Sequence, residues 1–245
     1  MRNTTLSVIV PAWNEEKRIG TVIASLQRAA AVYERERDAA TEIIVVDNNS
    51  SDRTSSVAQH CGATVVFEPI NNIGKARNAG AKVATGKYLA FCDADNEVTE
   101  NLLVLIHDHL EDLRIVGGGT WIVPATRSFK VRFFFFLWGL YVRFSRVGVG
   151  MLHCRRADFE TFGGFDETIY AAEDLQLAYA LKNLGRPRGQ KFKLLYQGWI
   201  ITSTRKIDQT PLLEMLSKLI GFGFGLQKKI RSKEYCAHWY DKAAR

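Results

Sequence analysis

Short apolar runs alternate with amphipathic segments of helical spacing through residues 6–92, and this alternation constrains the fold more than any other feature of the sequence. The apolar run at residues 6–10 predicts a buried strand. Asn14 predicts the cap of the next helix, with Glu15 and Glu16 in its first turn. The pattern continues with strands predicted at residues 42–46, 63–67 and 87–92 and with helices ending at Cys61 and covering residues 75–84. Such alternation predicts an α/β fold, a mostly parallel Rossmann-like sheet sandwiched by helices, with ligands at the carboxyl ends of its strands.

The second half of the chain is less regular. We expect strands near residues 115–123, 151 and 199–202, an aromatic helix over 129–146, a helix from Glu173 and an amphipathic helix from Pro211. The chain has 245 residues, of which 47% are hydrophobic, so it can bury a sizeable core. No linker or internal repeat divides it. We predict a single domain over residues 1–245, with a C-terminal amphipathic helical extension at 208–245.

The carboxylate pair Asp93-Ala94-Asp95 directly follows a predicted strand. In an extended strand, side chains i and i+2 lie on the same side, so Asp93 and Asp95 face one ligand while Ala94 turns away. Mg²⁺ and Mn²⁺ bind carboxylate oxygens and commonly keep substrate phosphates in their coordination shell. We assign the metal to Asp95, with Asp93 as a second ligand or as a contact to ribose or a metal-bound water. The alternative is a pair of loop carboxylates that closes the strand.

Two more acidic clusters fall at the ends of predicted elements. Asp47 either accepts hydrogen bonds from a base or ribose or closes an Asx-type turn, with Ser50 or Ser51 as the cap of the next helix. Glu173 and Asp174 either supply a general base or favour the first turn of a helix electrostatically.

Basic residues point to an anionic partner without identifying it. The net charge is +7 and the isoelectric point is near 9.3, but no nucleic-acid motif accompanies the charge, so we predict no nucleic-acid partner. Thr204-Arg205-Lys206 either brings two cations to a diphosphate or forms an ordinary basic turn. Four widely spaced cysteines fit a reduced cytoplasmic setting. Histidines without convincing ligand spacing, predicted to be structural or exposed, are His107, His109 and His153.

Six motifs in a fixed order resemble the family-two glycosyltransferases, which have the GT-A fold. The motifs are VIVPAWNEE at residues 8–16, VDNNSSD at 46–52, GKARNAG at 74–80, YLAFCDAD at 88–95, GGFDE at 163–167 and EDLQLAYAL at 173–181. Each motif alone is weakly specific, whereas the ordered set is highly specific. The resemblance covers most of residues 5–186.

The resemblance implies a nucleotide-binding half at residues 1–96 and an acceptor and catalytic half at 97–207. It also implies that Asp174 is the catalytic base, with Glu173 beside it. The full set of predicted donor contacts, Arg205 included, is Pro11, Ala12, Asn14, Glu15, Asp47, Asn49, Lys75, Arg77, Asn78, Asp93, Ala94, Asp95 and Arg205. The sequence departs from the family pattern at Asn48-Asn49, where Asp-Gly is frequent. This departure affects the expected geometry of the local turn more than the expected role of Asp47 in base recognition.

The implied reaction is an inverting transfer of a sugar from a nucleoside diphosphate sugar, UDP preferred over GDP, to an acceptor hydroxyl. A Mg²⁺ or Mn²⁺ ion would stabilise the departing diphosphate, and Asp174 would take the acceptor proton. The acceptor is expected on a sugar, a lipid-linked substrate or a cell-envelope glycan. The alternative is a catalytically silent GT-A module that binds a sugar nucleotide or docks on a membrane.

An uncharged apolar run at residues 133–142 lies between Arg132 and Arg143. As a helix it measures roughly 15 Å, against a bilayer hydrocarbon core of about 30 Å, so it cannot span a membrane. Either this aromatic segment, 129–146, is buried against the sheet, or it contacts a membrane surface or an acceptor lipid, as 211–231 also could. The protein is therefore expected to be cytoplasmic, or peripheral at the inner face of the membrane.

Overall fold

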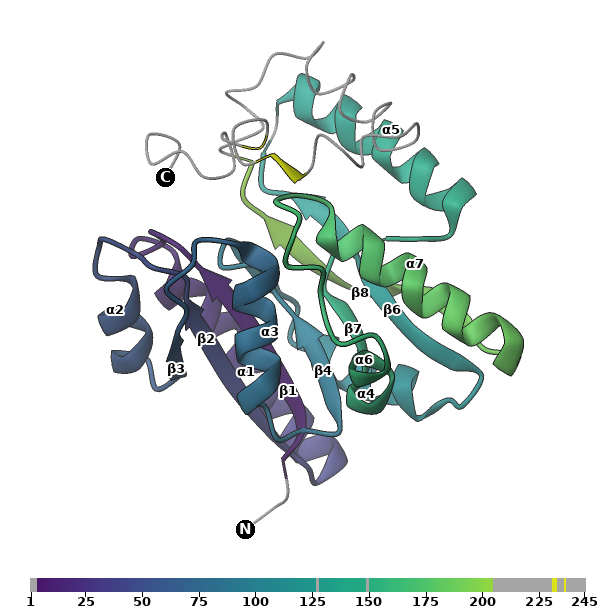
Figure 1. Ribbon diagram of the computed structural model, residues 1–245, viewed down its shortest axis with the longest axis horizontal. Helices are drawn as coiled ribbons and strands as arrows, with labels where there is room; N and C mark the ends of the chain where they lie inside the picture. The colour runs from purple at the N-terminus through teal and green to yellow at the C-terminus, as the bar shows by residue number, and fades with distance from the viewer. Residues whose placement is uncertain (1–3, 127, 149, 205–230, 233–235, 237–245) are drawn as a thin grey trace.

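The computed structural model describes residues 4–126, 128–148, 150–204, 231–232 and 236 (Figure 1). Within these residues, eight strands form one sheet in the order β3-β2-β1-β4-β7-β6-β8-β5. The strands are β1 (Thr4–Ala12), β2 (Ala40–Asp47), β3 (Thr64–Phe67), β4 (Tyr88–Phe91), β5 (Asn96–Val98), β6 (Ile115–Pro124), β7 (Leu152–Arg155) and β8 (Lys191–Thr202). The helices are α1 (Ile19–Arg37), α2 (Thr54–His60), α3 (Ile73–Val83), α4 (Leu102–Glu111), α5 (Phe129–Ser145), α6 (Arg156–Thr161), α7 (Glu173–Gly185) and the short 3-10 helix Arg186–Arg188.

Most strands of the sheet run in the same direction. β3, β2, β1 and β4 are parallel neighbours. β7 runs antiparallel to both β4 and β6, β8 is parallel to β6, and β5 is antiparallel to β8. The carboxyl ends of β1, β2, β4, β6 and β8 therefore lie along one edge of the sheet, and the predicted mostly parallel α/β fold is confirmed.

Helices cover both faces of the sheet. On β1, Leu6 and Val8 belong to the hydrophobic core that includes α1 and α4, whereas Ile9 belongs to the core that includes α3 and α7. This alternation follows from the two-residue period of a strand. β1 is buried on both faces, as expected of a central strand in a parallel sheet. Figure 1 shows α3 and α7 in front of the sheet, with the two halves of the chain meeting at β4 and β7.

The first helix begins later than the sequence predicts. α1 starts at Ile19 and its N-cap is Arg18, so the prediction of Asn14 as the cap is wrong. Asn14 has a left-handed backbone (φ 53°), and its side-chain oxygen accepts a hydrogen bond from the Ser51 N–H at 2.8 Å. The first turn of the helix consequently contains neither Glu15 nor Glu16. Asn14, Glu15 and Glu16 instead belong to the loop between β1 and α1. There the Asn14 side chain bonds to Ser51 of another loop instead of capping the helix.

Several further boundaries differ from the sequence expectations. β8 begins at Lys191, whereas only residues 199–202 were expected to be extended, and α4, α6 and β5 were not expected at all. Neither Ser50 nor Ser51 caps α2, because its N-cap is Arg53. The amphipathic helix expected from Pro211 lies outside the described residues. Within the described ranges, no helix is long and apolar enough to cross a membrane.

Two histidines form a buried pair between α4 and β7. His109 Nδ1 lies 2.8 Å from His153 Nε2, and His153 Nδ1 lies 2.9 Å from the Met151 carbonyl oxygen. Because a carbonyl only accepts, His153 donates from Nδ1, so its Nε2 accepts the His109 Nδ1 proton. The backbone of β6 approaches so closely that a Cβ at Gly118 would lie 2.6 Å from the His109 ring. Burial lowers the pKa of His109 to about 4, and burial together with the neighbouring His109 lowers that of His153 to about 3.

This pair predicts a loss of stability in mild acid. An unfolded histidine takes up a proton near pH 6.5, whereas the folded pair stays neutral down to about pH 4. The free energy of unfolding should therefore fall as the pH drops from 6.5 to 4, by up to about 1.4 kcal/mol per pH unit for each histidine. Urea unfolding across this range should show a shallower pH dependence for His109→Gln than for the wild type. His60→Gln, at an exposed position, is the matched control and should keep the wild-type dependence. Equal slopes for His109→Gln and the wild type would contradict this assignment.

Candidate active site

The loops after β1 and β2 are tied together at the carboxyl edge of the sheet. The Asn14 N–H donates to Ser50 Oγ at 3.0 Å, and the Glu15 N–H donates to Thr54 Oγ1 at 2.8 Å. Pro11 and Ala12 are the buried last residues of β1, in register with the end of β2. The structure thus brings together the predicted donor contacts of the first two motifs. The polar groups of the two loops thus satisfy one another, and each loop supports the shape of the other.

The turn after β2 explains the departure from the family pattern. Asp47 Oδ1 accepts a hydrogen bond from the Ser50 N–H at 3.0 Å, so its side chain closes the turn three residues along, one residue further than in an Asx turn. Asn49 has φ 65°, a left-handed conformation that asparagine adopts more readily than most residues other than glycine. Asn48 is buried and donates to the Ile70 carbonyl oxygen at 2.6 Å. Asn48-Asn49 therefore forms a tight turn without a glycine, and Asp47 sits at its base.

Asp93-Ala94-Asp95 forms a turn rather than a strand end. The Asn96 N–H donates to the Asp93 carbonyl oxygen at 3.1 Å, and β4 has already ended at Phe91. The two-residue period that led us to place both carboxylates on one side therefore does not apply. Ala94 is nonetheless buried, while Asp93 and Asp95 are half-buried. The Asp95 carbonyl oxygen accepts from the Ser203 N–H at 3.2 Å, which ties this turn to the residue after β8.

Arg77 is the cation that joins three elements of the site. From α3 it donates to Glu173 Oε1 at 2.5 Å and to Asp93 Oδ1 at 2.8 Å. The side chains of Arg77 and Glu173 are 5% and 6% exposed, so their charges are almost fully withdrawn from water, whereas that of Asp93 is 42% exposed. The guanidinium also lies 5.2 Å from the ring centroid of Phe165. Burial alone would lower the pKa of Arg77, but the charges of Glu173, Asp93 and Asp174 outweigh burial and raise it.

Asp174 differs from its neighbour Glu173 in its partners. Both residues open α7, after Ala172 in a left-handed conformation. The Asp174 side chain accepts a hydrogen bond from the Leu175 N–H at 2.7 Å, whereas the Glu173 side chain accepts one from Arg77. Burial and then the negative charge of Glu173 raise the pKa of Asp174 to about 7. Of the two carboxylates predicted from the sequence, Asp174 has the properties of a proton acceptor near neutral pH. Glu173 has the properties of a group that positions Arg77.

A loop over residues 163–169 is clamped to α3 by polar side chains. Asn78 accepts the Phe165 N–H at 2.8 Å and donates to the Phe165 carbonyl oxygen at 3.0 Å. Lys75 Nζ pairs with Glu167 Oε2 at 2.9 Å. Buried Asn72 accepts from the Lys75 N–H and donates to the Ile169 carbonyl oxygen, both at 2.9 Å. The side chains of Lys75 and Asn78, named from the sequence as donor contacts, therefore bind this loop, and their contact with a donor stays a prediction.

Sequence reasoning missed Asn72, Phe165 and Glu167. The GGFDE motif contains Phe165 and Glu167. The family resemblance identifies this motif but assigns no role to its individual residues. Its two glycines have left-handed backbones, and a Cβ at Gly164 would lie 2.4 Å from Asn78 Oδ1. The absence of a Cβ at Gly164 thus allows the loop backbone to approach Asn78. From the sequence alone, the two glycines could predict an unusual turn but not this contact.

Asp93 and Asp95 fit a hard divalent cation. Their carboxylate oxygens are the ligands that Mg²⁺ and Mn²⁺ favour, and the 42% exposure of the Asp93 side chain leaves it within reach of a ligand while Arg77 holds one of its oxygens. Among the residues that the structure describes, no group of three or more His, Cys, Asp or Glu side chains could hold a metal ion. Water and substrate phosphate oxygens commonly contribute to the coordination shell of Mg²⁺ in proteins. Arg205, the predicted diphosphate contact, lies outside the described residues.

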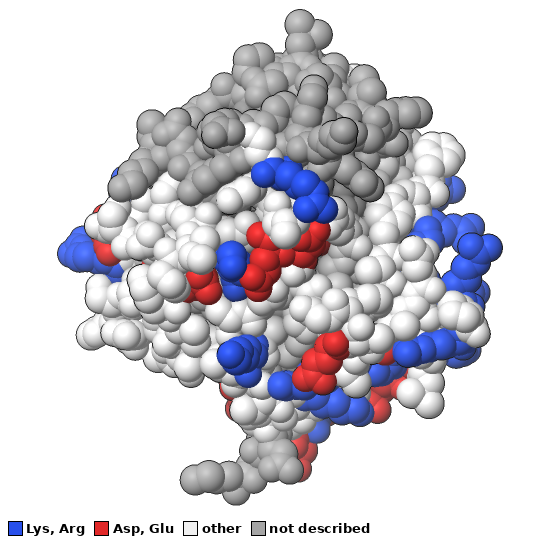
Figure 2. Space-filling model, viewed as in Figure 1, with Lys and Arg blue, Asp and Glu red and all other residues white. Residues whose placement is uncertain are grey.

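Charged atoms of both signs are intermingled on this side of the protein. Figure 2 shows Asp and Glu atoms gathered with Lys and Arg atoms near the middle of the face. At the loop of residues 163–169, Lys75 pairs with Glu167 and Arg231 pairs with Asp166. Because Asp93, Glu167 and Glu173 each pair with a basic side chain, these carboxylates can be held close together with less mutual repulsion.

Comparisons with known proteins place this chain among glycosyltransferases. Residues 7–147, more than half of the chain, match the family described as glycosyl transferase family 2. An uncharacterized glycosyltransferase of Mycobacterium tuberculosis (strain ATCC 25618 / H37Rv) is 36% identical over 98 residues, which are 40% of this chain and 40% of that protein. The probable glycosyltransferase YdaM of Bacillus subtilis (strain 168) is 28% identical over 204 residues, which are 74% of this chain and 47% of that protein. The chain thus spans less than half the length of these curated relatives.

Solved structures with the same fold include complexes with sugar nucleotides. The S. aureus TarS 1-349 structure in complex with UDP-GlcNAc has a TM-score of 0.63 and 19% identity, covering 82% of this chain and 58% of that one. The mannosyltransferase PcManGT from Pyrobaculum calidifontis, in complex with GDP-Man and Mn²⁺, has a TM-score of 0.64 and 20% identity, covering 90% and 65%. At these identities the likeness establishes the fold.

The buried pair of Arg77 and Glu173 predicts a large and non-additive mutational cost. Arg77→Met leaves the Glu173 carboxylate buried without its partner, so the free energy of unfolding should fall by about 3–5 kcal/mol. The double variant Arg77→Met/Glu173→Met should be less destabilised than Arg77→Met, because neither charge then remains buried. Urea unfolding of the complete double-mutant cycle measures the coupling.

The matched control is the exposed pair of Arg37 and Asp108, whose closest atoms lie 2.6 Å apart. Arg37→Met should leave stability near that of the wild type because water solvates the remaining carboxylate. Additive costs for Arg77→Met and Glu173→Met would show that the ion pair does not organise the site.

Proposed function

This chain belongs to glycosyl transferase family 2 and has the GT-A fold, and from this premise we propose that it transfers a sugar from a nucleoside diphosphate sugar to an acceptor hydroxyl with inversion at the anomeric carbon. One observation carries the proposal beyond the family match. Arg77 joins the acidic turn after β4 to the start of α7, so Asp93 and Asp174 belong to one electrostatic cluster. A metal-phosphate group and a proton acceptor are the two groups that such a transfer needs close together.

Asp174 is the proposed proton acceptor. As the acceptor oxygen forms its bond to the anomeric carbon, the bond from that carbon to the diphosphate oxygen breaks, and the acceptor proton passes to the Asp174 carboxylate. A raised pKa makes this carboxylate a stronger base than an ordinary aspartate. Glu173 is already neutralised by Arg77, so its role is to hold that guanidinium against Asp93. A single displacement of this kind inverts the anomeric centre.

The donor is proposed to lie along the carboxyl edge of β1, β2 and β4. Asp47 would accept hydrogen bonds from the base, with Asn14 and Glu15 beside the nucleotide, and UDP is preferred over GDP. Asp95, with Asp93, would hold a Mg²⁺ or Mn²⁺ ion. Such an ion, when bound, neutralises negative charge on the departing diphosphate. The acceptor is proposed to be a sugar or a lipid-linked or cell-envelope glycan, used at the cytoplasmic side of the membrane.

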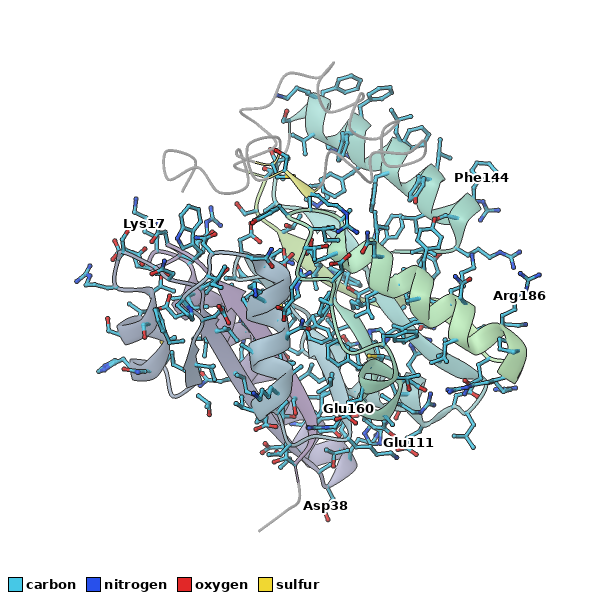
Figure 3. All side chains as sticks on the ribbon, in the orientation of Figure 1. Lys17, Asp38, Glu111, Phe144, Glu160 and Arg186 are labelled. Atoms are coloured by element: carbon cyan, nitrogen blue, oxygen red, sulfur yellow. The ribbon has the colours of Figure 1, made fainter. Side chains whose placement is uncertain are left out.

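Donor binding can be measured separately from turnover. Purified protein with Mn²⁺ is screened against UDP- and GDP-sugars by thermal unfolding, since a ligand that binds the native state raises the melting temperature. Release of nucleoside diphosphate is then measured with a panel of acceptors. Asp174→Asn should lower turnover by about 100- to 10,000-fold while donor binding is retained. Glu160→Gln, at the exposed position labelled in Figure 3, is the control and should keep wild-type turnover.

Two outcomes would count against the enzyme. If no donor stabilises the wild type and none is turned over, the proposal is wrong. If a donor binds but the wild type and Asp174→Asn are equally inactive, the chain is a silent sugar-nucleotide-binding module.

The metal assignment gives a further expectation. Stabilisation of the protein by UDP should require Mn²⁺ or Mg²⁺ and should disappear with a chelator. Asp95→Asn should need at least about tenfold more Mn²⁺ for the same rise in melting temperature, because it replaces a charged oxygen ligand by a neutral one. Glu97→Gln, an exposed carboxylate two residues away, is the matched control. Unchanged Mn²⁺ dependence in Asp95→Asn would remove Asp95 from the metal site.

A further inference from the structure

The outer face of α5 is an apolar stripe exposed to solvent. Phe129, Phe136 and Phe144 are 83%, 62% and 82% exposed, and Phe133 and Leu140 on the same face are also exposed. These five positions recur at intervals of three and four residues, so they line one side of the helix for about 22 Å. Contiguous exposed apolar patches commonly mark interaction surfaces in soluble folds. We propose that this stripe docks the protein on an anionic lipid bilayer, a partner that the proposed transfer reaction does not itself require.

The opposite side of α5 is attached to the rest of the fold. Val131 and Val142 are buried, and the Tyr141 hydroxyl lies 3.1 Å from that of Tyr179 on α7. Lys182 Nζ, also on α7, donates to the Ser145 carbonyl oxygen at 2.8 Å. The helix therefore presents a fixed outer face. Figure 3 shows labelled Phe144 at the outer end of this helix, away from the sheet.

The charges around the stripe match an anionic surface. Arg132 and Arg143 are exposed and lie on the same side of the helix as the phenylalanines. From residue 113 to residue 157 the sequence contains no Asp or Glu, although it contains eight Lys and Arg. Phenylalanine rings fit the boundary of the acyl chains, and arginines reach the phosphate groups.

The length and charge of α5 favour a bilayer surface over other occupants. The uncharged run between Arg132 and Arg143 is roughly 15 Å long as a helix, half of the hydrocarbon thickness, so α5 would lie in the plane of the interface. A second copy of the chain fits less well. In a two-fold antiparallel contact centred on the stripe, Arg132 of one copy faces Arg143 of the other, and like charges oppose each other.

Vesicle sedimentation tests the proposal with the full chain. The wild type should sediment with phosphatidylcholine vesicles that contain about one third phosphatidylglycerol, and added salt should weaken this binding. Phe136→Ser/Phe144→Ser should weaken binding about tenfold or more, because it removes apolar area from the docked face. Arg132→Gln/Arg143→Gln should weaken binding by about fivefold for each arginine and should reduce the salt dependence.

Matched controls separate the α5 face from general surface effects. Leu113→Ser/Val83→Ser removes exposed apolar side chains elsewhere, and Arg28→Gln/Lys82→Gln removes the same charge from α1 and α3. Both controls should bind vesicles like the wild type. Circular dichroism and the melting temperature, compared across all four double variants, show whether each is folded.

Three results would overturn the proposal. The wild type could fail to bind anionic vesicles, the α5 variants could bind as tightly as the wild type, or the controls could lose as much binding as the α5 variants. Sedimentation velocity adds a discriminating result: a dimer that only the α5 variants dissociate, without vesicle binding, would assign the stripe to a second copy. Donor stabilisation measured without vesicles reports on the transfer site separately, and Phe136→Ser/Phe144→Ser should retain it.

Discussion

The buried guanidinium of Arg77 is the constraint on which the site depends. A single cation from α3 satisfies Glu173 at the start of α7 and reaches Asp93 after β4. Without a positive charge at this point, the carboxylates would repel one another in a poorly solvated space. The arrangement also assigns different tasks to neighbouring acids, since Glu173 neutralises the arginine and Asp174 keeps a raised pKa. Arg77 therefore links the carboxylates of this acidic cluster among the residues that the structure describes.

The fold and the location of the site were predictable because they follow from local rules. Strand and helix periods in residues 6–92 predicted the parallel half of the sheet, and polar residues at strand ends marked the edge where the candidate site lies. The detailed geometry depended on distant contacts. Asn14 has the chemistry of a helix cap, but Ser50 and Ser51 from another loop bind it in a left-handed conformation instead. Periodicity carries no information about such a partner.

Side-chain roles were harder to predict than positions. Lys75 and Asn78 lie in a motif that suggested donor contacts, yet their hydrogen bonds hold the loop at residues 163–169, nearly ninety residues further along the chain. Likewise, Asp93 and Asp95 were placed by the rule for an extended strand, whereas a turn presents them. In both cases, the residue type predicted which kinds of hydrogen bond or ion pair the side chain could form. Only the fold determined which neighbouring group became its partner.

The pairing of β5 sets an order for synthesis and folding. β5 immediately follows the Asp93–Asp95 turn, yet it pairs with the end of β8, where Asn96 lies opposite Thr202. The N-terminal strands β1 to β4 can pair as soon as they leave the ribosome, but the far side of the acidic turn has no strand partner until about one hundred further residues have emerged. Contacts of such high sequence separation form late, because loop closure must precede any gain from pairing. A nascent chain can therefore form the β3-β2-β1-β4 half of its sheet while its acidic turn is still unanchored, so this turn is among the last parts of the candidate site to reach its final position.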